Sequence, residues 1–496
     1  MFFNKALRLS SNGSYRFAST TPIKKPSFAR KFLKFALLAT GGTLAANGIY
    51  EIYCARHPPD QFSFDPSKKT LAILGTGWAA TSFLKELDTE NYNVVIVSPR
   101  NYFLFTPLLP STTVGTVELR SIMQPIRYLT RFKQREIMFI EGDCQEINPE
   151  EKTIRVVDNS EVVGAVSVQS IKYDYLVVAC GADSATFGVP GVKEHACFLK
   201  EAWDARKIRT KLMDTIESAA FPGQPEEEVD RLLHMVVVGG GPTGVEYAAE
   251  LHDFVAEDLL EWYPGLAGKL KITLVEAMSN VLPMFSKSLI DYTEKHLKDS
   301  HVTLLKNTAV KAVEKDHIVV MNPEKELVKI PYGLLVWATG NTPRQVVSKL
   351  ISRLPGQTMR RGLMVEDTLM VKGAQDMFSL GDASATKWAP TAQVATGQGQ
   401  YLATIFNELG KDTSQDVRDV CERVGPFSYH HVGTLAYIGA DRAIAEFPGG
   451  LKLSGSMTYY FWRSAYLSEL FAFRNRVLVA FDWTKKNIFG RDISRE

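Results

Sequence analysis

Two short apolar runs, each closed by glycines, dominate the hydrophobic pattern of the chain. The first, Leu71–Leu74, ends in GTGWAA over residues 75–80. The second lies in Met235–Glu246, which reads MVVVGGGPTGVE. A buried run followed at once by closely spaced glycines is typical of a parallel strand, a tight turn and the first turn of a helix. We therefore expect the same strand–turn–helix unit twice.

Further apolar runs follow both glycine turns and predict the other strands of two parallel sheets. Such runs, alternating with helical segments, are typical of an α/β fold. Tyr332–Gly340 reads as a strand that returns to the first sheet, and a helix begins after Pro390. The other expected strands are Tyr92–Val97, Ile171–Gly181, Ile272–Glu276 and Met377–Asp382.

The small residues of each turn have separate roles in binding a dinucleotide. The first permits the turn, the second lets the backbone approach a pyrophosphate, and the third lets the helix pack against the strand. In that order they are Gly75, Gly77 and Ala80 in the first unit and Gly239, Gly241 and Gly244 in the second. The free amides of each helix N-terminus attract phosphate. Two such sites predict two dinucleotides and electron transfer between them.

Acidic residues distinguish the two units. In dinucleotide sites an Asp or Glu about 20 residues after the glycines binds the ribose. The first unit has no acid at this place, which leaves Ser98 and Arg100 as candidates. In the second, Glu276 ends its strand, so we expect it to bind the ribose hydroxyls and to favour NADH over NADPH. Glu246, in the first helical turn, is either a structural acid stabilised by the helix dipole or a carboxylate near nicotinamide and flavin.

Several segments of the first unit are suited to a planar cofactor. Tyr102–Pro110 is too apolar for a surface loop, and it either forms core or lies along the cofactor. Gly181 ends a buried strand, and Asp382 is placed to bind a ribityl hydroxyl. The helix after Pro390 offers its N-terminal amides to a flavin. Small residues such as Ala392 leave room for a flat substrate beside Gln393.

Composition narrows the function without defining it. The 496 residues predict about three domains, and a net charge of +2 gives no reason to expect a nucleic-acid partner. The five cysteines show no CxxC or CxxxxC spacing, so neither a zinc site nor a redox disulfide is expected. This argues against a disulfide reductase. A sulfide:quinone oxidoreductase would require reactive thiols near the flavin, for which Cys180 and Cys197 are the candidates.

The N-terminal region has the composition of a mitochondrial presequence. No acidic residue precedes Glu51, and residues 1–34 are rich in basic residues, Ser and Thr. A disordered basic tail is the alternative. Phe35–Tyr53 is apolar enough to be a membrane tether, and the cations before it place the N-terminus in the matrix and the remainder beyond the inner membrane. If these residues instead belong to a cleaved presequence, the protein faces the matrix.

Aromatic and basic residues mix in the C-terminal segment, 425–496. Met457–Phe473 is rich in aromatic residues, and Arg474–Arg491 alternates apolar with basic positions. This pattern predicts amphipathic helices that lie in a lipid interface and bind inner-membrane lipids. A helix that closes the core, or a homodimer interface, is the alternative.

Several long motifs together resemble one family. They are GTGWAA, VSPRNYFLFTPLLPS, VVVGGGPTGVE, LVEA, VWATGN, SLGD and PTAQVA. From Lys69 to the C-terminus the chain resembles the type II (alternative) NADH:ubiquinone oxidoreductases, and its N-terminal tether and ending resemble the fungal external mitochondrial forms. One departure is visible, because Thr396-Gly397 stands where the family has a residue followed by Gln.

The resemblance implies roles for individual residues. Gly75, Gly77, Thr106, Pro107 and Asp382 would contact non-covalent FAD. The NADH side would be lined by Gly239, Gly241, Gly244, Glu246, Glu276, Gly340 and Asn341. Glu246 and Gln393 would be the catalytic residues, with Ala392 beside the flavin where ubiquinone arrives. No metal is implied.

We therefore predict two doubly wound, Rossmann-like α/β domains, with the NADH unit (230–331) inserted in the FAD unit (68–229 and 332–424). The expected function is transfer of two electrons from NADH through FAD to ubiquinone without proton pumping. The expected location is the intermembrane-space face of the mitochondrial inner membrane. A redox-sensing flavoprotein that binds NADH and works through partners is the alternative.

Overall fold

The computed structural model describes residues 46–412 and 414–495. The predicted targeting region 1–34 and residues 35–45 of the predicted tether lie outside this range. Residues 46–56 form a helix within a separate unit that ends at His57, and residues 58–496 form the main body. None of the helices in the described ranges is both long and apolar enough to cross a bilayer.

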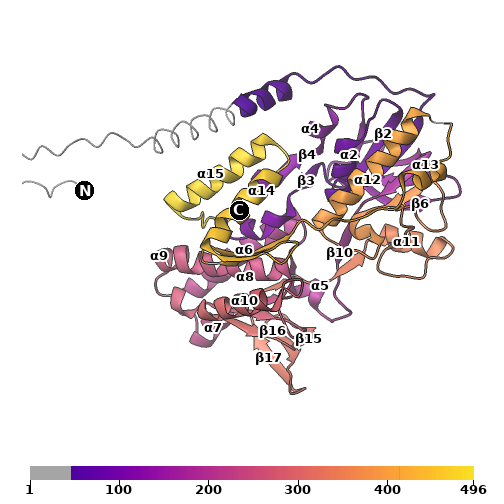
Figure 1. Cartoon of the computed structure of the whole chain (residues 1–496). Helices are drawn as coiled ribbons and strands as arrows, with labels where there is room; N and C mark the ends of the chain where they lie inside the picture. The colour runs from indigo at the N-terminus through magenta and orange to yellow at the C-terminus, as the bar shows by residue number, and fades with distance from the viewer. Residues whose placement is uncertain (1–45, 413, 496) are drawn as a thin grey trace, which may run out of the picture. The chain divides into compact units, whose positions relative to one another are not determined.

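The first sheet of the main body is parallel and has the strand order β21-β9-β1-β2-β5. Helices α2 (Trp78–Glu86) and α12 (Ala392–Lys411) pack on one face, and α11 (Gln345–Arg353) and the β6-β7-β8 sheet pack on the other. Figure 1 labels β2 of this sheet and the helices α2, α12 and α11 that surround it. The strands are β1 (Lys69–Leu74), β2 (Tyr92–Ser98), β5 (Met138–Glu141), β9 (Tyr175–Val178) and β21 (Met377–Ser379), and the small sheet comprises β6 (Asp143–Asn148), β7 (Thr153–Val157) and β8 (Val168–Lys172). This is the doubly wound unit that the first glycine turn predicts.

The second sheet repeats this plan with the order β11-β18-β12-β13-β14. Its core faces α6 and α8 on one side and the β15-β16-β17 sheet on the other. The bounds are β11 (Cys197–Phe198), β12 (His234–Val238), β13 (Lys271–Val275), β14 (Val302–Leu305), β18 (Leu334–Trp337), α6 (Ala202–Ala220), α8 (Pro242–Phe254), α10 (Lys287–Asp299), β15 (Ala309–Val313), β16 (His317–Met321) and β17 (Leu327–Pro331). The predicted fold class is therefore confirmed.

The predicted return of Tyr332–Gly340 to the first sheet is wrong. Its strand, β18, pairs in parallel with β12 and β11 of the second sheet, with Leu334 opposite Met235. Gly333 permits this pairing, because an added Cβ there would lie 1.9 Å from the Leu232 carbonyl oxygen. Since strands buried on both faces are apolar throughout, their sequence does not reveal which sheet they join.

Two short antiparallel strands carry the chain between the two units. Strand β10 (Ala182–Ser184) leaves the first unit, and β19 (Asn341–Pro343) returns to it. We call this pair the linker ribbon. The second unit is thus nested within the first.

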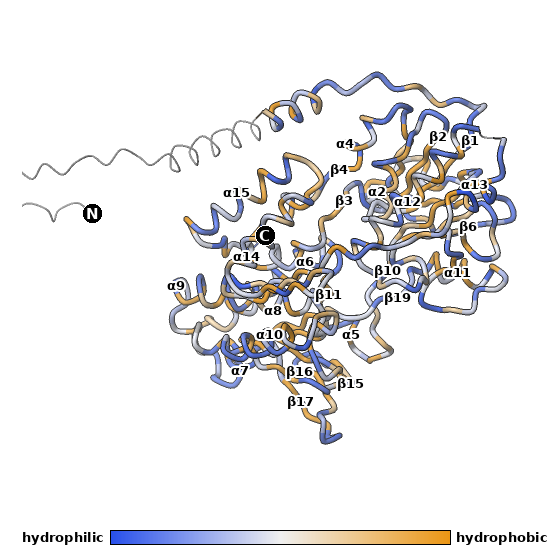
Figure 2. The backbone as a smooth tube through the Cα atoms, in the orientation of Figure 1, coloured by the Kyte–Doolittle hydropathy of each residue, from blue (hydrophilic) through white to orange (hydrophobic). Residues whose placement is uncertain are grey.

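The C-terminal segment adds a small antiparallel sheet and two helices. The sheet comprises β23 (Thr434–Gly439), β24 (Arg442–Glu446) and β25 (Lys452–Gly455), followed by α14 (Ser456–Glu469) and α15 (Phe473–Phe489). Trp462, Val479 and Trp483 pack into the core beside α8. Figure 2 shows polar and apolar positions alternating along α15, in agreement with the amphipathic pattern.

Shorter elements complete the main body. Before the linker ribbon they are β3 (Tyr102–Leu104), η1 (Thr106–Leu108), α3 (Leu109–Thr112), η2 (Leu119–Ile122), β4 (Met123–Pro125) and α4 (Ile126–Thr130). Between its two strands they are α5 (Val192–His195), α7 (Glu226–Leu232), the π-helical turn η3 (Val255–Leu259), α9 (Leu260–Trp262) and η4 (Ala267–Lys269), and after it they are β20 (Leu363–Met364), η5 (Gly381–Ala383), β22 (Ser384–Ala385) and α13 (Val417–Val424).

A glycine permits the close packing of α2 against α12. An added Cβ at Gly399 would lie 2.4 Å from the Ala79 carbonyl oxygen and 2.7 Å from the Phe83 nitrogen. We expect Gly399→Ala to lower the free energy of unfolding by about 1–3 kcal/mol, because the two helices must separate. Denaturant unfolding measures this change. Gly397→Ala is the control, since its nearest neighbour is the Phe427 ring at 3.6 Å, and should cost nothing or add up to about 1 kcal/mol. Equal losses in both variants would contradict the packing argument.

Candidate functional site

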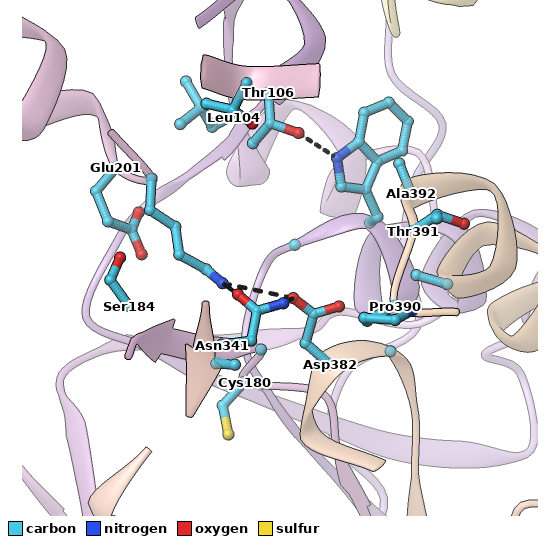
Figure 3. A pocket seen from close by; sticks show the side chains of 18 of the residues that line it. Leu104, Thr106, Cys180, Ser184, Glu201, Asn341, Asp382, Pro390, Thr391 and Ala392 are labelled. Atoms are coloured by element: carbon cyan, nitrogen blue, oxygen red, sulfur yellow. Dashed lines mark hydrogen bonds and ion pairs between the residues drawn. The ribbon is translucent and has the colours of Figure 1, made fainter. Parts of the chain in front are cut away.

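A cavity of about 360 Å³ lies between the carboxyl end of the first sheet and the linker ribbon (Figure 3). The turn before α2, the end of β9, the linker ribbon, the loop after β21 and the start of α12 all contribute to its lining. Eight of the predicted site residues line it: Gly77, Arg100, Thr106, Gly181, Gly340, Asn341, Asp382 and Ala392. We call it the main cavity.

A second cavity, of about 370 Å³, continues along the first glycine turn and is called the side cavity here. Gly75 and Ser98 line it, as does Arg100. Arg100, Cys180 and Arg344 line both cavities. The predicted residues of the first unit are therefore distributed along an elongated space, as an extended dinucleotide requires.

Both glycine turns are pressed against a neighbouring strand end. Gly75 has φ +107°, and an added Cβ would lie 2.4 Å from the Ala179 carbonyl oxygen. Gly239 has φ +117°, with the Ala338 carbonyl oxygen at 2.7 Å. At Gly77, by contrast, an added Cβ would meet no atom within 4 Å, so the space before the N-terminus of α2 is open. This cradle fits a pyrophosphate approaching the helix amides.

The apolar segment Tyr102–Pro110 contributes both to the core and to the lining of the main cavity. Phe105 and Leu108 are buried in the core, whereas Leu104, Thr106 and Leu109 line the main cavity. The Trp78 indole nitrogen donates a hydrogen bond to Thr106 Oγ1 at 3.0 Å, which Figure 3 shows at the cavity wall. Pro107 is absent from the described residues that line either cavity.

A polar group spans the floor of the main cavity. Lys200 Nζ donates to Asn341 Oδ1 at 2.6 Å and lies 3.5 Å from Asp382 Oδ2. Figure 3 shows Asn341 and Asp382 directed toward each other, and the Asn341 amide lies 3.4 Å from Asp382 Oδ2. Burial lowers the pKa of Lys200, and the Asp382 charge opposes this shift. Lys200 and Asn341 thus hold Asp382, and the sequence motif around Asp382 does not predict these contacts.

Gln393 faces the C-terminal segment. Its amide nitrogen donates to the Gly433 carbonyl at 3.0 Å, and Tyr429 donates its hydroxyl hydrogen to Oε1 at 2.7 Å. Gln398, shifted by one position from the family pattern, is buried and accepts from the Gly381 nitrogen at 2.7 Å. This glutamine therefore supports the loop that carries Asp382.

In the second unit, Glu276 stabilises the glycine turn from the next strand. Its carboxylate accepts hydrogen bonds from the Gly240 nitrogen at 2.5 Å and the Met278 nitrogen at 2.6 Å. The side chain stays partly exposed at the carboxyl end of β13. Gly244 packs under the same turn, because a Cβ there would lie 1.9 Å from the Gly239 carbonyl oxygen. Gly241 has open space before it, as Gly77 does in the first unit.

Glu246 is buried on α8 and directed at the C-terminal sheet. It accepts from the Tyr437 nitrogen at 3.2 Å. Burial raises its pKa to about 8, the Glu250 charge adds to the rise, and the Tyr437 hydrogen bond opposes it. It does not line the main cavity, although Thr243, one turn earlier on α8, does. The structural role is visible in these contacts, and a catalytic role stays a prediction.

Three further acids on and after α8 are buried against the C-terminal segment. Glu250 accepts from Ser111 Oγ and Thr116 Oγ1, both at 2.6 Å. Asp253 accepts from the Tyr437 hydroxyl and, at 2.8 Å, from the Ala440 nitrogen. Asp258 pairs with Arg491 at 2.6 Å, and Arg491 Nη2 lies 3.9 Å from Glu250. Sequence reasoning missed this cluster, although the acids recur at helical spacing.

The structure does not support the alternative of a sulfide:quinone oxidoreductase with reactive cysteines. Cys180 lies at the cavities in the first unit, whereas Cys197 is buried in β11 of the second sheet. Burial raises the pKa of Cys180 to about 11 and also raises that of Cys197, so both thiols are protonated at neutral pH. All five cysteines are free.

Comparison with known proteins gives concordant matches. Residues 69–399 match the family model "Pyridine nucleotide-disulphide oxidoreductase", and residues 431–492 match "NDH2 C-terminal domain". The external alternative NADH-ubiquinone oxidoreductase of Yarrowia lipolytica mitochondria is 50% identical over 95% of this chain and 88% of the relative. External NADH-ubiquinone oxidoreductase 2 of Saccharomyces cerevisiae mitochondria is 44% identical over 96% and 92%.

Solved structures agree on the fold. NDH2 from Plasmodium falciparum in complex with NADH matches with a TM-score of 0.80 and 28% identity, covering 86% of this chain and all of that chain. The sulfide:quinone oxidoreductase of Aquifex aeolicus matches with a TM-score of 0.63 at 18% identity, over 86% and 96% of the two chains, and indicates a shared fold only.

The raised pKa of Glu246 makes stability depend on pH. Between its usual pKa of 4.5 and about 8, the folded protein holds a proton that the unfolded chain has lost, so this contribution to stability falls as pH rises. We expect the melting temperature of wild type to fall relative to Glu246→Gln by at least about 2 °C between pH 6 and 8. Glu408→Gln is the control, because its Lys411 hydrogen bond lowers the pKa of that carboxyl. Parallel pH curves for wild type and Glu246→Gln would show that Glu246 is ionised throughout.

Proposed function

Because this chain belongs to the pyridine nucleotide-disulphide oxidoreductase family, in its NADH-ubiquinone oxidoreductase branch, we propose that it passes two electrons from NADH through FAD to ubiquinone without pumping protons. One observation of the structure carries this proposal. Gly77 of the first unit and Thr243 of the second line the same cavity, so the two dinucleotide sites converge. Convergence of the two sites is what direct transfer between two cofactors requires.

The protein positions the cofactors, and the chemistry belongs to the flavin. A bound FAD would supply the two-electron chemistry between NADH and ubiquinone. Asp382 would hold its ribityl chain, and the N-terminal amides of α12, beside Thr391 and Ala392, would favour negative charge on its ring. Glu276 binds the NADH ribose and repels a 2′-phosphate. Glu246 on α8 of the second unit and Gln393 on α12 of the first unit both face the C-terminal segment, where ubiquinone arrives.

The protein is mitochondrial, and it works at a membrane because ubiquinone is dissolved in lipid. We place the main body on the intermembrane-space side of the inner membrane. The cations Arg30, Lys31 and Lys34 before Phe35–Tyr53 support this orientation by the positive-inside rule. The relatives from Yarrowia lipolytica and Saccharomyces cerevisiae that are named "external" also support it.

Helices α14 and α15 are the proposed lipid contact. Each exposes large apolar side chains at helical spacing while its opposite face packs into the core. These side chains are Met457, Tyr460 and Phe461 on α14 and Val477, Phe481 and Ile488 on α15. Basic residues lie nearby, such as Arg474, which is exposed on α15. This arrangement suits a surface of anionic lipid. A homodimer through the same face is the competing occupant.

Oxygen uptake by intact mitochondria tests activity and orientation together. With the pumping dehydrogenase blocked, added NADH should drive uptake only in mitochondria that contain this protein, because NADH does not cross the inner membrane. A catalytically disabled variant with Gly77→Val is the matched control, since its side chain occupies the pyrophosphate path. Uptake that appears only after permeabilisation would place the main body in the matrix. No protein-dependent uptake in either preparation would contradict the activity.

Substitution of two exposed side chains on α15 tests the lipid contact. Phe481 and Ile488 are 62% and 65% exposed, so changing both to Asp should leave folding intact. We expect affinity for vesicles of phosphatidylcholine and cardiolipin to fall at least about tenfold, because each loses apolar burial. Leu327→Asp, 68% exposed on β17, is the control and should bind as wild type. Unchanged vesicle binding with loss of a dimer in sedimentation would assign the face to a second copy.

A further inference from the structure

A buried ion cluster separates the main cavity from the side cavity. Glu201 lies between two arginines: one carboxylate oxygen pairs with Arg100, and the other accepts from Arg344 Nη2 at 2.8 Å. Only a tenth of the Glu201 side chain is exposed. We call these three residues the Glu201 cluster.

Each arginine comes from a different part of the nested fold. Arg100 follows β2 in the first sheet, and Arg344 follows the returning strand of the linker ribbon. Arg344 also donates from Nε to the Cys180 carbonyl at 2.7 Å and pairs with Asp183 at 3.2 Å. Glu201 therefore joins Arg100 to Arg344, which the Cys180 carbonyl and Asp183 also hold, and so links two guanidinium groups from different parts of the fold.

The cluster lies where the pyrophosphate of an extended dinucleotide would pass. Gly75 lines the side cavity and Gly77 lines the main cavity, and the pyrophosphate binds between these two positions of the turn. Arg100 and Arg344 line both cavities. Guanidinium groups bind phosphate through charge and paired N–H donors.

Glu201 and Asp204 form the capping box that begins α6: the Glu201 side chain accepts from the N3 backbone nitrogen, and Asp204 Oδ2 accepts from the backbone nitrogens of Lys200 and Glu201 at 3.0 and 2.9 Å. An amide oxygen at position 201 can accept the same hydrogen bond, so the cap does not need the charge of Glu201. A carboxylate beside an anionic ligand otherwise weakens binding by repulsion. The presence of Glu201 here is explained if the binding free energy gained by orienting the arginines exceeds the binding free energy lost to that repulsion.

We propose that Glu201 is a positioning residue for the cofactor: it holds Arg100 and Arg344 in the orientation that receives the pyrophosphate of FAD. The inference rests on the proposed function, because that function supplies the dinucleotide. It adds Glu201 and Arg344 to the residues that the glycine fingerprint identifies.

Release of FAD from the diluted holoenzyme, followed by flavin fluorescence, measures the effect. We expect Glu201→Gln to raise the dissociation constant of FAD about tenfold, because the arginines lose their fixed orientation. Glu294→Gln is the matched control. Its carboxylate pairs with Lys306 at 2.7 Å and lines neither cavity, so FAD binding should match wild type.

Two outcomes would overturn the proposal. Tighter binding of FAD by Glu201→Gln would show that charge repulsion outweighs positioning. An unchanged dissociation constant with a lowered melting temperature would show a purely structural ion cluster. Arg344→Lys gives a second measure, since it keeps the charge but loses the bonds to Glu201 and Cys180, and it should also weaken FAD binding. It decides the question if Glu201→Gln does not fold.

FAD binding by the wild-type protein distinguishes a failure of this inference from a failure of the proposed function. A folded wild-type protein that does not bind FAD would contradict the proposed function itself. A wild-type protein that binds FAD, with Glu201→Gln and Arg344→Lys binding equally well, would contradict only the role of the Glu201 cluster.

Discussion

The two dinucleotide units depend on the absence of a side chain at one position in each. At Gly75 and Gly239 the backbone has a positive φ, and an added Cβ would clash with a carbonyl oxygen at the end of the neighbouring strand, that of Ala179 or Ala338. Ala179 and Ala338, with the two residues after each, line the main cavity. The close packing at each glycine turn therefore also brings the ends of β9 and β18 to the same main cavity. The nested topology and the linker ribbon follow from this convergence.

A second constraint joins the NADH unit to the C-terminal helices. Helix α8 begins at the second glycine turn and then presents Glu246, Glu250 and Asp253 to the C-terminal segment. These acids are buried, so each requires donors. Tyr437 of β23 and Ala440 just after it supply those of Glu246 and Asp253, whereas Ser111 and Thr116 supply those of Glu250. One helix thus connects the NADH cradle with the proposed membrane face. A change at either end of α8 acts on rigid, hydrogen-bonded neighbours.

The local pattern predicts the elements well and their long-range partners poorly. Most strands of both units, and the helix after Pro390, lie where periodicity and glycines predict them. The predicted strand Ile171–Gly181 is an exception, because it contains the end of β8 and, after a break, β9 of another sheet. The prediction placed Leu334–Trp337 in the wrong sheet, because the sequence of a buried parallel strand does not indicate which strands lie beside it. For the site, fingerprint glycines and strand-end residues such as Asp382 are readable. Lys200 and Arg344 cannot be identified from the local sequence, because they reach the cavities only through tertiary folding. The E-x-x-D spacing from Glu201 to Asp204 is the one local sign near them, and it indicates a helix start.

The burial of Arg491 links two distant parts of the chain in the order of assembly. Its guanidinium pairs with Asp258 and Glu257 and approaches Glu250, all of which precede it by more than two hundred residues. A polypeptide is synthesised, and a mitochondrial precursor imported, from its N-terminus. Glu250, Glu257 and Asp258 therefore emerge more than two hundred residues before this cation. Until Arg491 has been delivered, these acids lack it as a counter-ion, so their ion pairs with it form after the rest of the NADH unit has been made.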